Sequence, residues 1–270
     1  MNNYHTHTFR CRHAQGDVAD YVAAAADAGL SELGFSDHCP YPDGRWPSVR
    51  MAMADLPDYL EALRTAKTRA AASASSPRIL SGLECEWSPE YESFFREEYL
   101  GRLGLDYLAG GIHSYLHGGE WRDTFAISEA SELGYFAETT CRAIESGLFA
   151  FLAHPDVFCF SWLPWDESAR SCAADILSTA ESSGCLLEIN GYGMRKKKVG
   201  GAGGTRPPYP RPEFWRLASD YDITCIVNSD AHRPVDTAAN LAEGRELAAR
   251  FGLKVAEALP LQNASHKIGK

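Results

Sequence analysis

Short apolar segments alternate along the chain with longer amphipathic or alanine-rich segments. Seven of the short segments have the length of buried strands: residues 4–8, 33–36, 79–84, 107–112, 151–153, 186–190 and 223–228. Four of the longer segments have helical patterns: residues 17–28, 55–72, 128–146 and 166–182. This order predicts a parallel sheet. About seven βα units without a G-x-G-x-x-G dinucleotide motif favour a closed or nearly closed β/α barrel over a doubly wound sheet.

The length of 270 residues is more typical of one barrel than of two half-sized domains. Two stretches interrupt the alternation, residues 40–47 and residues 191–212, and both are rich in proline and other turn-forming residues. We interpret them as long loops, which are often functional in a compact domain. The sequence therefore predicts a single α/β barrel domain over residues 1–259 and a C-terminal tail over residues 260–270.

The charge of the chain excludes some partners. A formal net charge of −10 argues against stable binding to nucleic acid or to anionic membranes, because both are polyanions. No apolar run has the length of a membrane span, and the chain begins with polar, histidine-rich sequence rather than an apolar leader. We therefore expect a cytoplasmic protein. The pattern leaves the oligomeric state open.

Potential metal ligands stand at the ends of almost all the predicted strands. His5 and His7 are two residues apart in an extended segment, so their side chains leave the same face and can converge on one ion. Further candidates follow along the chain: His13, Asp37, His38, Glu84, Glu86, His113, His154, Asp156, Asp230 and His232. Because the carboxyl ends of parallel strands meet at one mouth of a barrel, these side chains are expected to gather there.

The number of candidates indicates more than one ion. Seven histidines with Glu84 and Asp230 make nine groups, which is too many for one tetrahedral zinc ion and suits three ions if a carboxylate bridges two of them. Imidazole and carboxylate ligands suit zinc, manganese or iron. The scattered cysteines form no C-x-x-C pair and give no sign of a thiolate site. We expect three divalent ions.

The ordered motifs H-T-H with His13, S-D-H, G-L-E, G-I-H, A-H-P-D and S-D-A-H resemble the PHP (polymerase and histidinol phosphatase) superfamily from His5 to His232. The resemblance implies a distorted (β/α)7 barrel and three ligand sets. The first set is His5, His7, Glu84 and Asp230. The second is Glu84, His113 and His154, with Glu84 bridging to the first. The third is His13, His38 and His232.

The segments L-E-I-N, G-M-R-K and Y-P at residues 209–210 narrow the resemblance to the histidinol-phosphate phosphatase branch. That branch implies that Arg195 contacts the substrate phosphate, although a basic run such as residues 195–198 is usually a solvated loop. One departure concerns the stretch after Asp156, where the branch typically carries basic residues but residues 157–164 contain neither arginine nor lysine. The departure puts the natural substrate in doubt and leaves the metal ligands unaffected.

The leading hypothesis is a metal-dependent phosphatase acting on a small phosphomonoester, with L-histidinol phosphate first among the substrates. Glu84 and Asp230 would hold the ions that provide a water nucleophile near neutral pH, and a histidine or aspartate near the third ion, with Asp37 as the candidate, would protonate the leaving alkoxide. Two alternatives remain open: a phosphoesterase acting on a nucleotide, sugar phosphate, phosphotyrosine or oligonucleotide end, and a noncatalytic metal-binding module. Glu86 could support a ligand histidine or be a surface carboxylate, and Asp37 and Asp156 could orient a ligand imidazole or have capping or turn roles.

Overall fold

A parallel sheet forms the centre of the molecule. In the computed structural model, which describes residues 1–201 and 204–261, this sheet has eight strands in the order β1-β2-β3-β4-β7-β8-β11-β12. Their bounds are β1 Asn2–Asn3, β2 Glu32–His38, β3 Arg78–Cys85, β4 Tyr107–Gly110, β7 Phe151–Leu152, β8 Leu186–Asn190, β11 Thr224–Asn228 and β12 Lys254–Val255. All neighbouring pairs are parallel, as the strand and helix alternation predicts.

The sheet curls until its first and penultimate strands approach each other. A parallel bridge joins Thr6, after β1, to Ala231, after β11. The hydroxyl of Tyr107 on β4 crosses the interior and donates to the carbonyl of Tyr4 at 2.7 Å. Glycine at position 82 leaves room for this tyrosine, since a Cβ there would lie 2.7 Å from its ring. The carboxyl ends of distant strands are therefore brought to one mouth.

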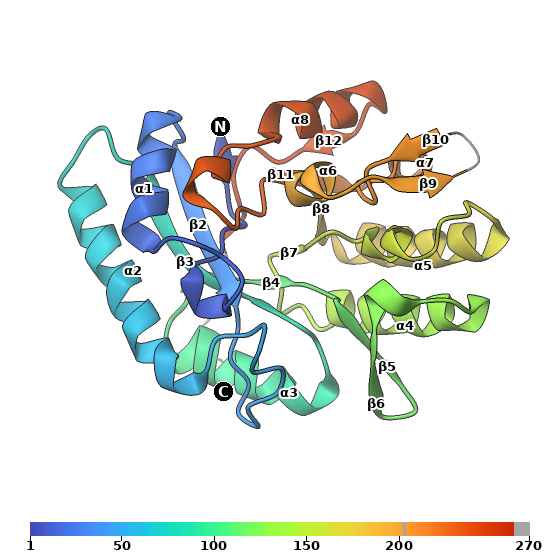
Figure 1. Cartoon of the computed structure of the whole chain (residues 1–270), viewed down its shortest axis with the longest axis horizontal. Coiled ribbons are helices and arrows are strands. Elements are labelled where there is room, and N and C mark those ends of the chain that lie inside the picture. The colour runs from blue at the N-terminus through green and yellow to red at the C-terminus, as the bar shows by residue number, and fades with distance from the viewer. Residues whose placement is uncertain (202–203, 262–270) are drawn as a thin grey trace.

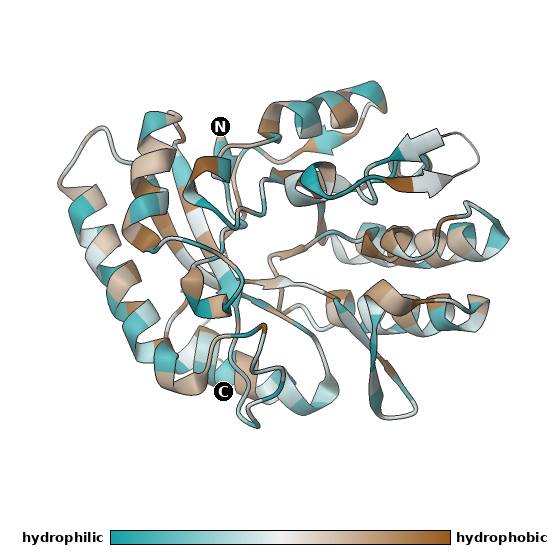
Figure 2. Ribbon diagram, viewed as in Figure 1, coloured by the Kyte–Doolittle hydropathy of each residue, from teal (hydrophilic) through white to brown (hydrophobic). Residues whose placement is uncertain are grey.

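Helices cover the outside of the curled sheet (Figure 1). They are α1 Val18–Asp27, α2 Leu56–Ala71, α3 Pro89–Phe94, which continues as a π-helix over Phe95–Arg102, α4 Ala130–Glu145, α5 Glu167–Ser183, α6 Gly191–Arg195, α7 Pro212–Ala218 and α8 Leu241–Arg250. Asp17 caps α1, and Gly184 ends α5 at φ 71°. Hydrophilic and hydrophobic residues alternate along α1, α2 and α8, as expected where one face packs on the sheet (Figure 2).

The α/β architecture confirms the predicted class, and the alternation predicted six of the seven strands and the four helices close to their positions. The strand predicted over residues 4–8 is wrong: β1 covers Asn2–Asn3, and of residues 4–8 only Thr6 pairs with another segment, through its single bridge to Ala231. The sheet has one strand more than the predicted seven within the described residues, because the two-residue β12 pairs with β11 beyond the bridge to Thr6. The prediction of a long loop over residues 191–212 is wrong for much of that stretch. That stretch contains α6 and an antiparallel pair, β9 Val199–Gly201 and β10 Gly204–Arg206.

Three further observations bear on the predictions. Residues 114–124, for which no strand was predicted, form a hairpin of β5 Ser114–His117 and β6 Glu120–Asp123. Of the predicted tail, residues 262–270 lie outside the described residues, whereas Leu261 packs against a cluster that includes Tyr4 and Leu259. Among the helices of residues 1–201 and 204–261, none combines the length and the apolar character needed to cross a bilayer.

Candidate metal centre

Glu84 lies at the centre of the site, near the end of β3. Its carboxylate oxygens lie 3.4 Å from His5 Nε2, 3.0 Å from His38 Nδ1 and 3.0 Å from His154 Nε2. Gly111 makes room for this carboxylate, because a Cβ there would lie 2.2 Å from Glu84 Oε1. One buried carboxylate therefore contacts histidines contributed by three different βα units.

The four residues of the first set converge. His7 Nε2 lies 3.2 Å from Asp230 Oδ1 and 3.6 Å from Glu84 Oε2, while His5 Nε2 lies 3.7 Å from Asp230 Oδ1. Both imidazoles are fully buried. His5 and His7 leave the same face of the extended segment after β1, as their spacing predicted.

The second and third sets lie on either side of the first. In the second set, His113 Nε2 is 3.8 Å from Glu84 Oε1, and the rings of His113 and His154 are 4.6 Å apart. In the third set, His13 Nε2 and His232 Nε2 are 3.1 Å apart, and the His38 ring lies 5.1 Å from the His13 ring. All nine side chains predicted from the sequence as ligands thus gather at one place.

Several buried atoms in this cluster lack a hydrogen-bonding partner among the described residues. They are His5 Nε2, both ring nitrogens of His7, His38 Nδ1, His154 Nδ1, Glu84 Oε2 and Asp230 Oδ1. A buried polar atom without a partner is costly, and so many in one place require an explanation. Divalent ions held by imidazole nitrogens and carboxylate oxygens satisfy these atoms, so the residues present fit the expected metals.

The two central carboxylates carry negative charge. Burial raises the pKa of Glu84, but His5 and His113 offset this effect and hold it well below its usual value. Burial also raises the pKa of Asp230, but His5 and His232 offset this effect and hold the pKa well below its usual value. Both carboxylates are therefore ionised at neutral pH. Burial, together with the charge of His232, lowers the pKa of His13 to about 4, which keeps this imidazole in the neutral form that binds metals.

Two ligand candidates adopt strained backbone conformations. His154 has φ 32° and Asp230 has φ 52°, in a region that residues with a side chain rarely adopt. Such conformations persist only where the surrounding structure enforces them, and they concentrate at functional sites. Here each directs a side chain toward the cluster.

Glu188 supports the first set, and sequence reasoning did not single it out. Its Oε1 lies 2.7 Å from His5 Nδ1, and its Oε2 accepts the backbone N–H of His154 at 3.0 Å. Asn228 and Asn190 donate to the same carboxylate. A carboxylate on the far nitrogen of a ligand histidine fixes the ring and its tautomer. The available signal was a single charge within the apolar strand of residues 186–190.

Glu86 supports His113 in the same manner. It is buried, lies 2.7 Å from His113 Nδ1 and accepts the backbone N–H groups of His113 and Ser114. Arg50 neutralises it, with Nη2 2.5 Å from Oε1. Of the two roles considered for Glu86, the structure therefore favours support of a ligand histidine over a surface position.

Asp37 and Asp156 lie beside the cluster. Asp37 accepts from the backbone N–H and the hydroxyl of Thr8 and from the backbone N–H of His38, and its Oδ1 lies 3.6 Å from His7 Nδ1. It is completely buried and positions the ligand segments, whereas its predicted proton transfer stays a prediction. Asp156 accepts the backbone N–H of Arg211 at 2.5 Å, and burial raises its pKa to about 6.

Arg195 and Lys196 are neighbours in the chain, but only Lys196 lines the cavity over the cluster. The Arg195 guanidinium donates to the carbonyls of Ser229 and Asp230 at 2.8 and 3.2 Å and to Asn240 Oδ1 at 3.1 Å. It is not part of the lining of the cavity over the cluster, whereas Lys196 is. The predicted contact of Arg195 with phosphate therefore stays a prediction, and the observed role is to hold the backbone around Asp230.

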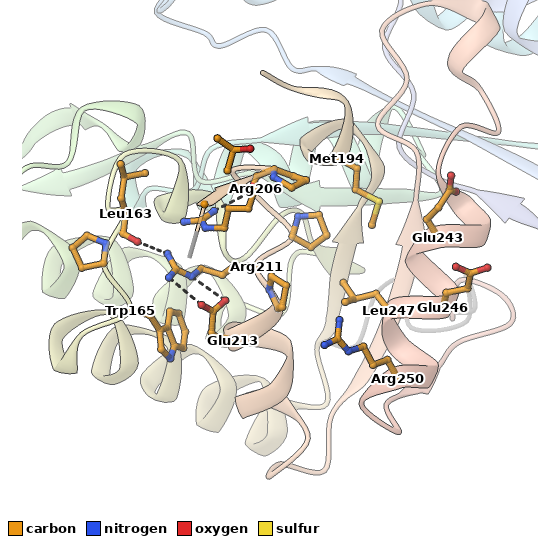
Figure 3. A pocket seen from close by; sticks show the side chains of 16 residues that line it. Leu163, Trp165, Met194, Arg206, Arg211, Glu213, Glu243, Glu246, Leu247 and Arg250 are labelled. Atoms are coloured by element: carbon orange, nitrogen blue, oxygen red, sulfur yellow. Dashed lines mark hydrogen bonds and ion pairs between the residues drawn. The ribbon is translucent and has the colours of Figure 1, made fainter. Parts of the chain in front are cut away.

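The cluster opens into a cavity of about 420 Å³, a volume typical of small-molecule sites. Its walls include seven of the predicted ligands: His7, His13, His38, Glu84, His113, Asp230 and His232. A larger cavity of about 820 Å³ contains none of them (Figure 3). Its Arg211 is occupied by Glu213 and the carbonyl of Leu163, and its Arg206 donates to backbone carbonyls. The smaller cavity is therefore the candidate site.

Comparisons with known proteins agree with this geometry. Residues 3–191 match the PHP domain family. A Deinococcus radiodurans protein named "Probable histidinol-phosphatase" is 33% identical over 251 residues, which cover 88% of this chain and 89% of that protein.

Two solved structures share the fold. Histidinol phosphate phosphatase from Lactococcus lactis, complexed with zinc, L-histidinol and phosphate, has a TM-score of 0.71 at 14% identity and 94% coverage of both chains. A structure from work on the metal-dependent tyrosine phosphatases YwqE of Bacillus subtilis and CpsB of Streptococcus pneumoniae has a TM-score of 0.51 at 18% identity, covering 93% of this chain and 88% of that one. At these identities the likeness concerns the fold alone. The family match over residues 3–191 and the 33% identical relative show that this chain belongs to the PHP domain family.

Proposed function

We propose that this protein is a metal-dependent phosphatase that hydrolyses a small phosphomonoester, with L-histidinol phosphate as the leading substrate. The observation that carries the proposal is the group of unsatisfied imidazole and carboxylate atoms around Glu84 and Asp230, which open into a cavity of small-molecule size. The 33% identical relative named "Probable histidinol-phosphatase" supports the choice of substrate. With that substrate, the protein would act in histidine biosynthesis and in the cytoplasm.

We infer three divalent ions, of zinc, manganese or iron, held by the three ligand sets. When bound, such ions neutralise phosphate charge and lower the pKa of water to near neutral. The residues of the chain have separate tasks. Glu84, which contacts the histidines of the first two sets and His38 of the third, ties the sets together, while Glu188 and Glu86 orient His5 and His113. Asp37 stays the candidate for protonating the leaving alkoxide, acting beside His7 and His38.

One observation favours a second hypothesis, a phosphatase with a different substrate. The segment after Asp156 forms a 3₁₀ turn, Val157–Phe160, whose first three residues are buried. Residues 157–164 contain neither arginine nor lysine, so they offer no cation to a phosphate where the histidinol-phosphate phosphatase branch typically has one. Another phosphomonoester, such as a sugar phosphate, a nucleotide or phosphotyrosine, is therefore the alternative substrate. A noncatalytic module is disfavoured because all nine expected ligands are present and assembled.

A substrate panel separates these readings. We expect no hydrolysis after exhaustive chelation and recovery on adding Zn²⁺ or Mn²⁺. On the reconstituted protein, kcat/KM for L-histidinol phosphate should exceed that for p-nitrophenyl phosphate by at least about a hundredfold, the discrimination expected when a pocket recognises polar groups of the leaving group. Equal values would reject histidinol phosphate as the substrate. Activity that survives complete metal removal would reject the proposed chemistry.

A further inference from the structure

A phosphatase of this kind needs positive charge for the substrate phosphate in addition to its metal ions. Two expected sources do not reach the cavity. The turn after Asp156 carries no basic residue, and Arg195 donates to the carbonyls of Ser229 and Asp230 and is not among the residues that line the cavity. The cations that do line the cavity are Arg50 and Lys196.

Lys196 follows α6 and lines the cavity together with Tyr192 and Phe125. Its Nζ lies 4.2 Å from the centre of the Tyr192 ring and 6.0 Å from that of Phe125. Among the described residues it has neither a hydrogen-bond acceptor nor an acidic partner within ion-pair distance. Burial lowers its pKa, so the ammonium has lost much of its hydration. A bound anion would replace the missing water, and the aromatic rings already favour a cation at this position.

Arg50 enters the cavity from another element, the loop between β2 and α2. Its side chain is buried, and two of its nitrogens are engaged, Nη2 with Glu86 and Nη1 with the Val49 carbonyl. The remaining Nε is buried and lacks a partner among the described residues. Through Glu86 the guanidinium is linked to His113, a ligand of the second set. Arg50 thus keeps one donor unused next to the expected ions.

We propose that Lys196 and Arg50 form the phosphate subsite of this cavity, with the Lys196 ammonium as its main contact and the unused Arg50 Nε–H as its second. This inference rests on the proposed phosphatase function and names the residues that bind the phosphate group of the substrate. In this chain the two residues take the place of the cation that the segment after Asp156 lacks.

The test measures the affinity of inorganic phosphate for zinc-loaded protein by calorimetry, together with its inhibition constant against a phosphomonoester. Lys196→Met should weaken phosphate binding about ten- to a hundredfold, the usual effect of losing a charge-assisted contact, and should raise KM by a similar factor. Lys196→Arg keeps the charge, so its phosphate affinity should stay within about fivefold of that of the wild type. Arg50→Lys, which keeps a cation beside Glu86 but loses the Nε–H, should weaken phosphate binding about tenfold.

Lys197→Met is the matched control, because Lys197 is the next residue, is exposed and lies outside the cavity lining. It removes the same charge and should change phosphate affinity by less than about twofold, as expected for a screened surface charge. Zinc content is measured for every variant by elemental analysis and should equal that of the wild type.

The outcomes are distinct. Unchanged phosphate affinity in Lys196→Met, an equal loss in Lys197→Met, or loss of zinc in Lys196→Met would each overturn the subsite, while wild-type hydrolysis would leave the phosphatase function standing. A zinc-loaded wild type that neither binds phosphate nor hydrolyses any phosphomonoester would overturn the proposed function, and the subsite with it.

Discussion

At the residue scale, two buried glutamates determine how the ligand histidines are oriented. Glu188 holds His5 and Glu86 holds His113, each at 2.7 Å from Nδ1, so that the Nε2 of each ring faces Glu84. In each metal-binding ring such a contact places the N–H on Nδ1 and leaves Nε2 free for an ion. The nitrogens proposed to bind metal are therefore already oriented by the fold.

Removing the charge of Glu188 tests this support. Glu188→Gln should weaken zinc binding about ten- to a hundredfold, as losing a carboxylate behind a ligand histidine usually does. Competition with a chromophoric chelator measures the affinity. Glu138→Gln, on the exposed side of α4, removes one negative charge from the surface and should bind zinc like the wild type. Equal affinities for Glu188→Gln and the wild type would show that Glu188 does not support the site.

Asp156 gives a pH dependence of known sign. Burial raises its pKa from 3.8 to about 6, so the folded protein holds this proton more tightly than the unfolded chain. The stability contributed by the neutral carboxyl is fully present below pH 3.8 and is lost as pH rises through 6. Between pH 4.5 and 7.5 this linkage lowers the free energy of unfolding by about 2 kcal/mol.

Asp156→Asn lacks that titration. We therefore expect the difference in unfolding free energy, wild type minus variant, to become more negative by about 2 kcal/mol between pH 4.5 and 7.5. Urea unfolding of both metal-free proteins at the two pH values measures it. A difference that is independent of pH, or that grows in the opposite direction, would contradict the raised pKa.

The site could be predicted from the sequence where a ligand is adjacent to a strand with a clear pattern. His5, His7 and Glu84 lie in strand-like segments and Asp230 follows one, and parallel strands bring their carboxyl ends together. The residues that orient the ligands were harder to predict than the ligands themselves, because their role depends on packing across the sheet. Arg50 is the extreme case, since it lies in a loop without periodicity and only the tertiary fold brings it to Glu86.

At the element scale, the β5–β6 hairpin supports the loop that carries Arg50. Trp121 on β6 packs edge-on against Trp46 with ring centres 5.0 Å apart, and the Arg45 guanidinium lies 5.5 and 5.3 Å from the two rings. Trp46 itself has φ 54°, a strained conformation that needs outside support, and it lines the cavity. The hairpin therefore stabilises one wall of the site.

Trp121→Ala should loosen that wall. Losing the aromatic pair is worth about 0.5–1.5 kcal/mol, so we expect KM for the phosphomonoester to rise about three- to tenfold, with zinc content unchanged. Trp165→Ala removes a tryptophan that lines the larger cavity instead, and its KM should match the wild type. The idea fails if both variants have the same KM.

The long helices and buried strands were predictable because their apolar residues repeat over many positions, as in α2 and β8. The β5–β6 hairpin was not predictable, because Tyr115 is its one buried residue. A strand pattern needs apolar residues at every second position, and this hairpin has no such repeat. The two-residue β12 is too short to carry any pattern. These elements form through contacts with distant parts of the chain, which local sequence does not encode.

At the scale of the whole molecule, the ligands come from both ends of the chain. His5 and Asp230 are 225 positions apart, and besides the expected ions they are joined through the Thr6–Ala231 bridge and a few side-chain hydrogen bonds, such as that from Asn3 Nδ2 to Ser229 Oγ. Ions bound to both would tie the segment after β1 to the segment after β11 and so hold the curled sheet together. The metals should therefore contribute to folding stability as well as to chemistry.

Zinc should raise the free energy of unfolding measurably. A free ion concentration one hundred times the dissociation constant adds about 2.7 kcal/mol for each ion that binds only the folded state. Denaturant unfolding of chelated and zinc-loaded protein measures the gain, and calcium, which prefers oxygen ligands, is the control that should leave stability unchanged. Equal stability with and without zinc would show that the ions do not link the strands.

The most direct test of the account counts the metal bound by each chain. Elemental analysis of zinc-reconstituted protein, dialysed free of excess metal, should give three divalent ions per wild-type chain. Glu84→Gln should give at most one, because Glu84 belongs to two of the three ligand sets. A wild-type protein that retains no zinc, or a Glu84→Gln protein that retains as much as the wild type, would contradict a metal centre built around this carboxylate.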